Sequence, residues 1–310
     1  MSVAAGMPKR VRVVEVGPRD GLQNEPVVLP VDVKVEFIRR LAASGLPMIE
    51  AGAFVRPDRV PQMADTDEVL RRLQSLAGPI LPGPVLTALV PNRRGMERAL
   101  ACGLREVAVF TAASESFARR NINSSIAESL AAFGEVLRLA NEHGARVRGY
   151  ISTAWWCPYE GRVSPEAVRR VALGLMELGC CEIALGDTIG AATPEDVSAL
   201  IAQIAQDVPV ASIGVHFHDT RGTALANVLT ALLCGITSVD SSAGGLGGCP
   251  YAPGASGNLA TEDLLYMLHG MGIETGVNLD AVAEASRALA PALGHPLPSR
   301  YLQAGAPKRV

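Results

Sequence analysis

Two histidines, His216 and His218, lie two residues apart within a run of residues that favours a β-strand. Side chains alternate across a strand, so both imidazoles share one face and Phe217 points to the other. Two imidazoles on one face can bind a divalent metal ion together. The alternative is a pair of core histidines whose hydrogen bonds are satisfied by neighbouring groups. The spacing favours a metal site if another element supplies a carboxylate.

Polar residues also gather at the ends of other strand-like runs. Arg19 and Asp20 follow the first run, Glu50 closes the second, and Asp187 with Thr188 closes a later one. An ionised Asp20 offers two acceptor oxygens and could join the histidines as a metal ligand. For Arg19 and Glu50 the alternative is a buried ion pair with a structural role.

A glycine-rich segment, GGLGGCPY at 244–251, surrounds Cys249. Four glycines in five residues are incompatible with the interior of a helix or strand and give the backbone a free choice of φ. The segment predicts a loop that brings the Cys249 thiol to a substrate when it closes. The alternative is a loop that binds phosphate and carries the cysteine incidentally.

Lysine is scarce, since only three of the 28 Lys and Arg residues are lysines: Lys9, Lys34 and Lys308. Enzymes that work through a Schiff base, including those that use pyridoxal phosphate (PLP), need a lysine at the active site. Lys9 and Lys308 lie in the terminal arms, and Lys34 lies in a helix patterned for the surface. We expect no Schiff-base lysine and no PLP, so carbonyl chemistry would need a metal ion as its electrophile.

The composition of the 310 residues indicates a globular protein, with 48% hydrophobic and 19% charged residues. The formal net charge of −3 lacks the basic excess of a nucleic-acid-binding protein, so we expect no nucleic acid partner. The first residues do not read as a signal peptide, and the apolar runs are too short to cross a membrane. The six cysteines include no C-x-x-C pair, which favours a reducing, cytoplasmic setting.

The pattern of the chain predicts a parallel α/β fold. Apolar, β-branched runs at 11–16, 47–53, 84–90, 106–112, 146–153, 182–187, 212–219 and 238–244 alternate with helical patterns such as 31–44, 124–143, 165–178, 194–207 and 223–234. Eight such units indicate a (β/α)₈ TIM barrel. A doubly wound sheet is the rival, but no G-x-G-x-x-G follows the first run. We expect one domain over 1–310, with the barrel at about 11–258 and a C-terminal helical extension at about 259–310.

A barrel of this kind gathers its chemistry at the carboxyl ends of the strands. The polar residues noted above lie at those ends, and we therefore expect them to meet at one mouth.

Several segments of the chain closely resemble the 3-hydroxy-3-methylglutaryl-CoA lyase family, a family of metal-dependent TIM-barrel lyases. They are VEVGPRDGLQNE at 14–25, NIN at 121–123, CPYEG at 157–161, LGDTIG at 185–190 and ASGNLATED at 255–263. The likeness runs in one register from about 11 to 279, which is nearly the whole chain. It implies a retro-aldol type cleavage that yields acetyl-CoA and acetoacetate, with coenzyme A as part of the substrate.

The resemblance implies a divalent cation, Mg²⁺ or Mn²⁺, and a set of residues that hold it. The implied metal ligands are Asp20, His216, His218 and Asn258. Oxygen and nitrogen ligands without a thiolate suit such a hard cation. The implied catalytic residues are Arg19, Asp20, Glu50, His216 and Cys249.

The reaction explains these residue types. A base must take the tertiary hydroxyl proton, and His216, His218 or Asp20 could serve. Arg19 is permanently charged and can stabilise the developing enolate. Cys249 can then protonate the enolate carbon, and Glu50 can orient Arg19 or a water on the metal.

We expect the acyl-CoA substrate to contact Arg19, Gln23, Asn92, Asp187 and Thr188. Four arginines, Arg93, Arg94, Arg119 and Arg120, could pair with the CoA phosphates or could be ordinary solvated charges. The resemblance also favours a homodimer.

The chain departs from the family near the pocket. Ala51 to Phe54 stand where the family has small hydroxyl residues, Thr153 to Trp156 replace a cysteine and smaller residues, and 294–296 lack the usual basic residues. These changes leave open a lyase for a longer or different 3-hydroxyacyl-CoA. A Claisen-condensing synthase and a catalytically silent binding barrel are further alternatives.

Overall fold

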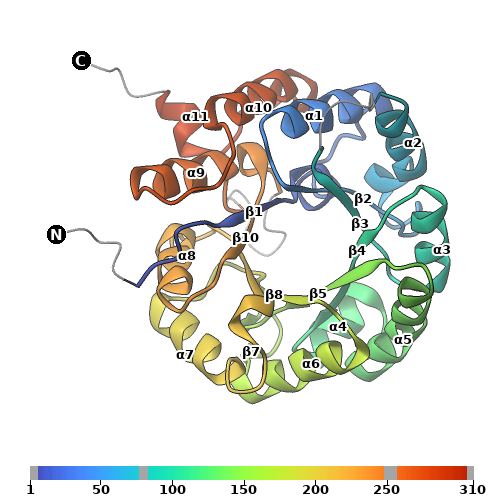
Figure 1. Cartoon of the computed structure of the whole chain (residues 1–310), viewed down its shortest axis with the longest axis vertical. Helices are drawn as coiled ribbons and strands as arrows, with labels where there is room; N and C mark the ends of the chain where they lie inside the picture. The colour runs from blue at the N-terminus through green and yellow to red at the C-terminus, as the bar shows by residue number, and fades with distance from the viewer. Residues whose placement is uncertain (1–5, 77–82, 248–256, 306–310) are drawn as a thin grey trace.

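A computed structural model describes residues 6–76, 83–247 and 257–305. Eight parallel strands form a closed barrel in the order β1-β10-β9-β8-β5-β4-β3-β2 (Figure 1). The predicted (β/α)₈ TIM barrel is therefore confirmed. The described residues contain no helix that is both long and apolar enough to cross a membrane.

Each strand of the barrel falls within one of the eight predicted runs. The strands are β1 (Arg12–Glu15), β2 (Met48–Ala53), β3 (Val85–Leu89), β4 (Glu106–Ala112), β5 (Arg146–Ser152), β8 (Glu182–Asp187), β9 (Ile213–Phe217) and β10 (Ser238–Ser241). Ladder pairing ends earlier than the apolar patterns at β9 and β10. The residues that follow these two strands therefore belong to the loops at the mouth of the barrel.

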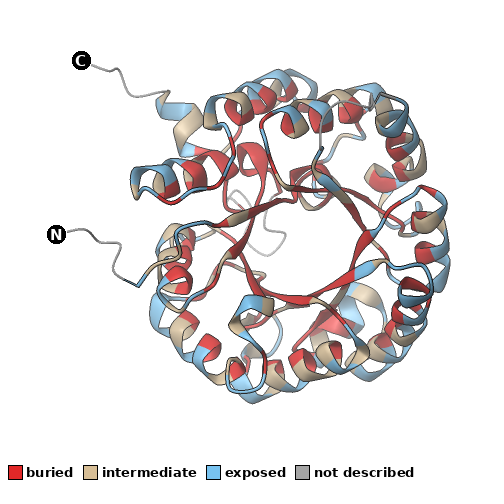
Figure 2. Ribbon diagram, in the orientation of Figure 1, coloured by how far each residue is buried: buried red, intermediate tan, exposed pale blue. Residues whose placement is uncertain are grey.

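Helices surround the barrel and turn their apolar faces inward, as the buried positions in Figure 2 show. They are α1 (Val31–Ala43), α2 (Thr66–Leu76), α3 (Arg93–Ala101), α4 (Glu115–Ile122), α5 (Ile126–Glu142), α6 (Pro165–Leu178), α7 (Pro194–Ile204) and α8 (Ala224–Leu233). Local signals fix several ends. The Ser125 hydroxyl and the Glu128 carboxylate form a capping box at the start of α5, and Gly179 ends α6 in the left-handed region at φ 103°.

The C-terminal segment completes the helical layer (Figure 1). It contains α9 (Thr261–Gly270), α10 (Leu279–Leu293) and α11 (Arg300–Ala304). Helix α10 packs against α1 and α9, so the C-terminal segment lies against the first helix of the layer. A short hairpin, β6 (Trp156–Cys157) with β7 (Gly161–Arg162), lies between β5 and α6.

Lys34 differs from its expected place at the surface. Its ammonium group is buried, donating to Asp65 Oδ1 at 2.6 Å and to the carbonyl oxygen of Gln62 at 2.5 Å. Because α1 carries this side chain on the outside of the barrel, Lys34 is not at the mouth where the polar residues meet.

Candidate active site

Three predicted metal ligands meet at the mouth of the barrel. Asp20, His216 and His218 each offer one ligand atom, and these atoms all lie within 4.8 Å of one another. Asp20 lies in a π-helical turn, Gly17–Gly21, directly after β1. The histidines lie at the end of β9, whose alternation turns both imidazoles to the same side. Closure of the barrel thus brings together residues almost 200 positions apart.

Asn258, the fourth predicted metal ligand, lies next to this cluster and is held there by its backbone. It forms an isolated antiparallel bridge with His218. Its Nδ2 donates to Asp20 Oδ2 at 2.9 Å and to the carbonyl oxygen of Leu246 at 3.1 Å. Gly247 packs against this amide, since a Cβ there would lie 2.7 Å from Asn258 Nδ2. Position 247 therefore has to carry a residue without a side chain.

Two buried polar atoms in the cluster lack a hydrogen-bond partner among the described residues: His218 Nδ1 and Asn258 Oδ1. Buried polar atoms of this kind are rare and often accompany an ion or water. With the Asp20 carboxylate they form a donor set of oxygen and nitrogen, which suits a hard divalent cation. The residues present therefore fit a metal ion.

The protonation states also suit metal binding. Burial opposes ionisation of Asp20, but Arg19 and the two histidines outweigh it and lower the pKa of this carboxyl to about 2. Burial and the neighbouring His216 lower the pKa of His218 to about 4. Burial disfavours a charged His216, but Asp240 outweighs this effect and raises its pKa. A carboxylate and a neutral His218 are the forms that bind metals.

Arg19 lies beside the cluster of candidate metal ligands. Its Nε donates to Glu50 Oε2 at 2.6 Å and its Nη1 to Asp20 Oδ1 at 2.5 Å. The guanidinium also lies over the ring of Tyr150, 5.4 Å from its centroid. Glu50 is fully buried on β2, and its second oxygen has no partner in the described part of the chain. Burial, only partly offset by Arg19, raises the pKa of Glu50.

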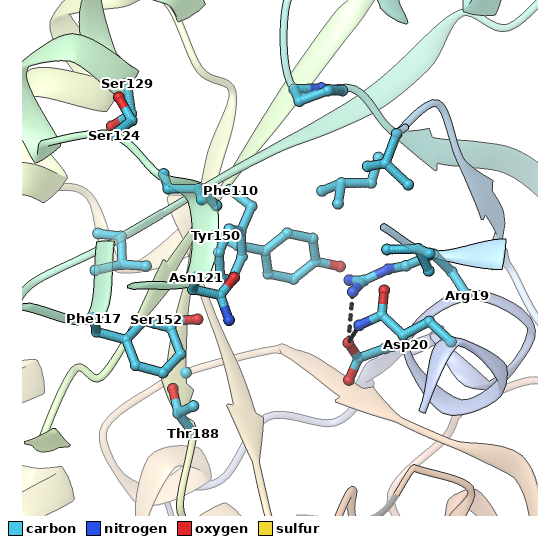
Figure 3. Close-up of a pocket in the computed structure, with 18 of the residues that line it drawn as sticks. Arg19, Asp20, Phe110, Phe117, Asn121, Ser124, Ser129, Tyr150, Ser152 and Thr188 are labelled. Carbon is cyan, nitrogen blue, oxygen red and sulfur yellow. Dashed lines mark hydrogen bonds and ion pairs between the residues drawn. The ribbon is translucent and has the colours of Figure 1, made fainter. Parts of the chain in front are cut away.

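A cavity of about 550 Å³ opens beside this cluster. Figure 3 shows Arg19 and Asp20 at one end and Phe117 with Asn121 at the other. The Tyr150 ring projects between the two ends with its hydroxyl toward Arg19 (Figure 3). One end therefore carries charged groups, and the other combines the Phe117 ring with uncharged polar groups such as Asn121 and Thr188.

The other predicted substrate contacts have different positions. Gln23, Asn92 and Thr188 line the cavity. Asn92 also caps α3, accepting a hydrogen bond from the Gly95 backbone at 3.1 Å. Asp187 is fully buried and does not line the cavity in the described residues.

The Asp187 carboxylate accepts hydrogen bonds from the backbone N–H groups of Ala191 and Ala192, at 3.0 and 3.1 Å. Burial, opposed by these hydrogen bonds, raises its pKa to about 6. Here Asp187 shapes the loop after β8, and its contact with substrate stays a prediction.

None of the four arginines suggested for the CoA phosphates lines this cavity, as far as the structure describes the chain. Arg93 pairs with Glu97, Arg119 with Glu115, and Arg120 lies over the ring of Tyr159. Two other arginines, Arg56 and Arg59, do line the cavity. They follow β2 in a loop that the sequence did not single out.

Cys249 lies outside the described residues, but the backbone that leads into its loop is firmly held. Glu15 accepts from Ala243 N at 2.8 Å, and Glu262 accepts from Gly244 N at 2.9 Å. Both acids are fully buried. Burial raises the pKa of Glu15 to about 8 and that of Glu262 to about 7.

Sequence reasoning also missed three buried residues beside the site. Tyr150, Arg148 and Asp240 are buried inside the barrel, and Arg148 Nη1 donates to the Tyr150 hydroxyl at 2.9 Å. The sequence did contain a signal for two of them, because Arg148 and Tyr150 lie two residues apart and so share one face of a predicted strand. A charged residue on the inner face of a barrel strand needs a buried partner, and that partner lies 92 residues away at Asp240.

Comparison with known proteins agrees with this geometry. The HMGL-like family model matches residues 10–289. The hydroxymethylglutaryl-CoA lyase of Pseudomonas mevalonii is 58% identical over 284 residues, covering 92% of this chain and 93% of that protein. The mitochondrial enzyme of Bos taurus is 53% identical (96% and 90% covered), and the cytoplasmic enzyme of Homo sapiens is 50% identical (98% and 80% covered).

Solved structures show the same likeness. The HMG-CoA lyase of Bacillus subtilis superposes with a TM-score of 0.93 at 47% identity, covering 97% of this chain and 99% of that one. An HMG-CoA lyase from Acinetobacter baumannii, solved with coenzyme A and 3-methylmalate, gives 0.90 at 36% identity and covers 97% of each chain.

Proposed function

The chain belongs to the HMGL-like family, and on that premise we propose that it is a carbon–carbon lyase that cleaves 3-hydroxy-3-methylglutaryl-CoA to acetyl-CoA and acetoacetate. The observation that carries this proposal is the cluster of Asp20, His216 and His218 beside Arg19, at the charged end of a cavity. Relatives named for this activity are 50–58% identical over most of the chain.

A divalent cation is part of this proposal. Asp20, His216, His218 and Asn258 would hold it, and Mg²⁺ or Mn²⁺ fits their oxygen and nitrogen donors. When bound, such an ion lowers the pKa of the substrate hydroxyl and orients it.

The first task of the chain's own residues is to take the proton from the C3 hydroxyl. Asp20 and His216 are the candidate bases, because both lie in the cluster that the hydroxyl would approach. As the proton leaves, the O–H electrons form the ketone of acetoacetate. The C2–C3 bond breaks, and its electron pair moves into the thioester fragment as an enolate.

Arg19 would stabilise the negative charge on that enolate oxygen. Its guanidinium carries a permanent charge and is only 4% exposed, so its field is weakly screened. Glu50 would fix the orientation of this group through the 2.6 Å contact with Nε. Such preorganised charge is usually a large contribution to catalysis.

Cys249 would complete the reaction by giving a proton to the enolate carbon, which produces acetyl-CoA. Its sequence setting supports this role, because the glycine-rich segment lets the backbone place a thiol at the mouth. The anchoring of Ala243 and Gly244 by buried glutamates fixes where that segment starts.

The residues that line the cavity support an acyl-CoA substrate. Arg19, Gln23 and Thr188 would contact the polar acyl group, and Asn92 would lie near the mouth. Asp187 would act through the loop that it holds. Apolar residues such as Phe110 and Phe117 would contact the carbon chain of the acyl group. A larger 3-hydroxyacyl-CoA is therefore the alternative substrate.

We further propose that residues 1–310 form one domain, with the barrel at about 11–258 and the extension at about 259–310. The packing of α10 on α1 supports this unit. A homodimer and a cytoplasmic location complete the proposal, although relatives include both cytoplasmic and mitochondrial enzymes.

The decisive experiment is an assay of the purified protein with Mg²⁺ or Mn²⁺ and a panel of 3-hydroxyacyl-CoAs, with products identified by mass. We expect acetyl-CoA and acetoacetate from the 3-hydroxy-3-methylglutaryl thioester in preference to longer homologues. Faster cleavage of a longer homologue would show that this homologue, and not the 3-hydroxy-3-methylglutaryl thioester, is the substrate. Failure to cleave any member with metal present would favour a silent binding barrel.

A further inference from the structure

Asp240 lies directly behind His216 inside the barrel. It is on β10, next to β9, where the two residues are direct partners in the strand register. The Asp240 Oδ2 lies 3.2 Å from His216 Nδ1. Because Asp240 is only 1% exposed and a carboxylate accepts hydrogen bonds, Nδ1 is the nitrogen that carries the proton.

Asp240 is itself held by a second buried side chain. Arg148 on β5 donates from Nη2 to Asp240 Oδ1 at 2.7 Å and from Nη1 to Oδ2 at 3.0 Å. This two-point contact fixes both the plane and the position of the carboxylate. Arg148 Nε in turn donates to Glu182 Oε1 at 2.7 Å. The carboxylate behind His216 therefore has little freedom to rotate.

The backbone of β9 makes room for this arrangement. Gly214 lies two residues before His216 and faces the same side of the strand. A Cβ at Gly214 would lie 2.7 Å from Arg148 Nη2 and 2.9 Å from Glu182 Oε1. The strand that carries the metal ligands thus lacks a side chain at the point where the guanidinium lies.

The contact with Asp240 fixes the orientation of the His216 ring. With Nδ1 bound to Asp240, Nε2 is directed toward Asp20, 3.8 Å from its Oδ2. The two histidines of the pair therefore differ. Nδ1 of His218 has no partner among the residues described, so its ring is left for a ligand to fix.

We propose that Asp240 is a positioning residue for metal binding, which sets the tautomer and ring orientation of His216, and that Arg148 holds Asp240 for this task. The inference rests on the proposed metal-dependent function and adds to it two residues that do not touch the substrate. Carboxylates behind ligating histidines typically change metal affinity 10- to 100-fold when they are removed.

The test is direct titration of the metal-free full-length chain with Mn²⁺, followed by electron paramagnetic resonance of the free ion. Asp240→Asn should weaken Mn²⁺ binding about 10- to 100-fold. The asparagine is neutral and keeps only one acceptor oxygen, because its NH₂ group donates, so it cannot replace both carboxylate oxygens that face Arg148 and His216. Glu182→Gln is the matched control, because it removes a charge from the same buried network without touching Asp240. It should change the affinity less than about threefold, and an equal loss in both variants would overturn the proposal.

A double variant, Asp240→Asn with Arg148→Met, separates positioning from charge balance and protects the test if the single variant folds poorly. It removes both members of the buried pair, and Glu182 keeps its ion pair with Arg12, so no uncompensated charge remains. If Asp240 acts through His216, the double variant still binds Mn²⁺ weakly. Recovery of wild-type affinity would show that Asp240 only neutralises Arg148 and would overturn the proposal. If the wild-type chain itself fails to bind Mn²⁺, the proposed metal centre fails and this inference fails with it.

Discussion

Arg19 on the turn after β1 and Glu50 on β2 form a buried ion pair, in which Nε and Oε2 lie 2.6 Å apart. The contact with Glu50 uses Nε of the guanidinium, and Nη1 donates to Asp20 Oδ1 at 2.5 Å. One arginine is thereby fixed between a buried carboxylate and a metal-ligand candidate. A lysine could supply the charge at this position but not the fork of donors.

We therefore expect Arg19→Lys to lower kcat by about 100-fold or more, because the charge would no longer be aimed at the enolate oxygen. Mn²⁺ affinity should change much less, since Asp20 keeps its contacts with Gln23 and Asn258. Steady-state kinetics and Mn²⁺ titration of the same preparation check this. Retention of full turnover by the lysine variant would contradict the role given to Arg19.

Cys249→Ala should reduce turnover far more than metal binding, because the thiol is proposed to deliver a proton and is not among the proposed metal ligands. Cys181→Ala is a suitable control, since Cys181 lies on the opposite end of the barrel, just before β8. Turnover and Mn²⁺ affinity should be measured for both variants. Parallel loss of both properties in Cys249→Ala would exclude an acid role.

Stability should fall as the pH rises from about 5 to about 8. Burial raises the pKa of Glu15 to about 8 and of Glu262 to about 7, from the ordinary glutamate value of about 4.5. The folded chain therefore holds protons that the unfolded chain releases above about pH 4.5. This stabilisation is complete below that pH and is lost as the pH rises through 7 and 8. Urea unfolding across this range measures the effect.

Glu262→Gln isolates one of these two acids. The glutamine stays neutral and can still accept from Gly244 N, so the variant should match the wild type near pH 5 and exceed its stability near pH 8. Glu177→Gln on the exposed face of α6 serves as the control and should leave the pH dependence unchanged. A wild-type curve that rises with pH would show that both glutamates are ionised in the folded chain.

Removal of divalent ions should lower the melting temperature, and their return should restore it. A ligand that binds only the folded state stabilises it by about 2.7 kcal/mol at a concentration 100 times its Kd. The ion would also supply the missing partners of His218 Nδ1 and Asn258 Oδ1. Calorimetry with chelator, and then with excess Mg²⁺ or Mn²⁺, tests this. His218→Ala should show the same melting temperature with and without the ion.

The sequence alone determined the architecture and the core of the site. Alternating apolar runs and helical patterns specified the eight strands, because strand and helix periods follow from local geometry. The same period of two placed His216 and His218 on one face. Lysine scarcity led us to expect no Schiff-base lysine, and the resembling segments pointed to the family and its reaction. Each of these properties is encoded in residues close together along the chain.

Tertiary structure alone decided which distant groups touch. Asn258 meets Asp20 across 238 positions, and Arg148 meets Asp240 across 92. Neither contact leaves a local pattern, because barrel closure and strand register bring these residues together. Burial then set their chemistry, since it removes water from the charges and leaves each one to the partners that the fold provides. The sequence could name the proposed metal ligands, but only the fold shows what holds them in place.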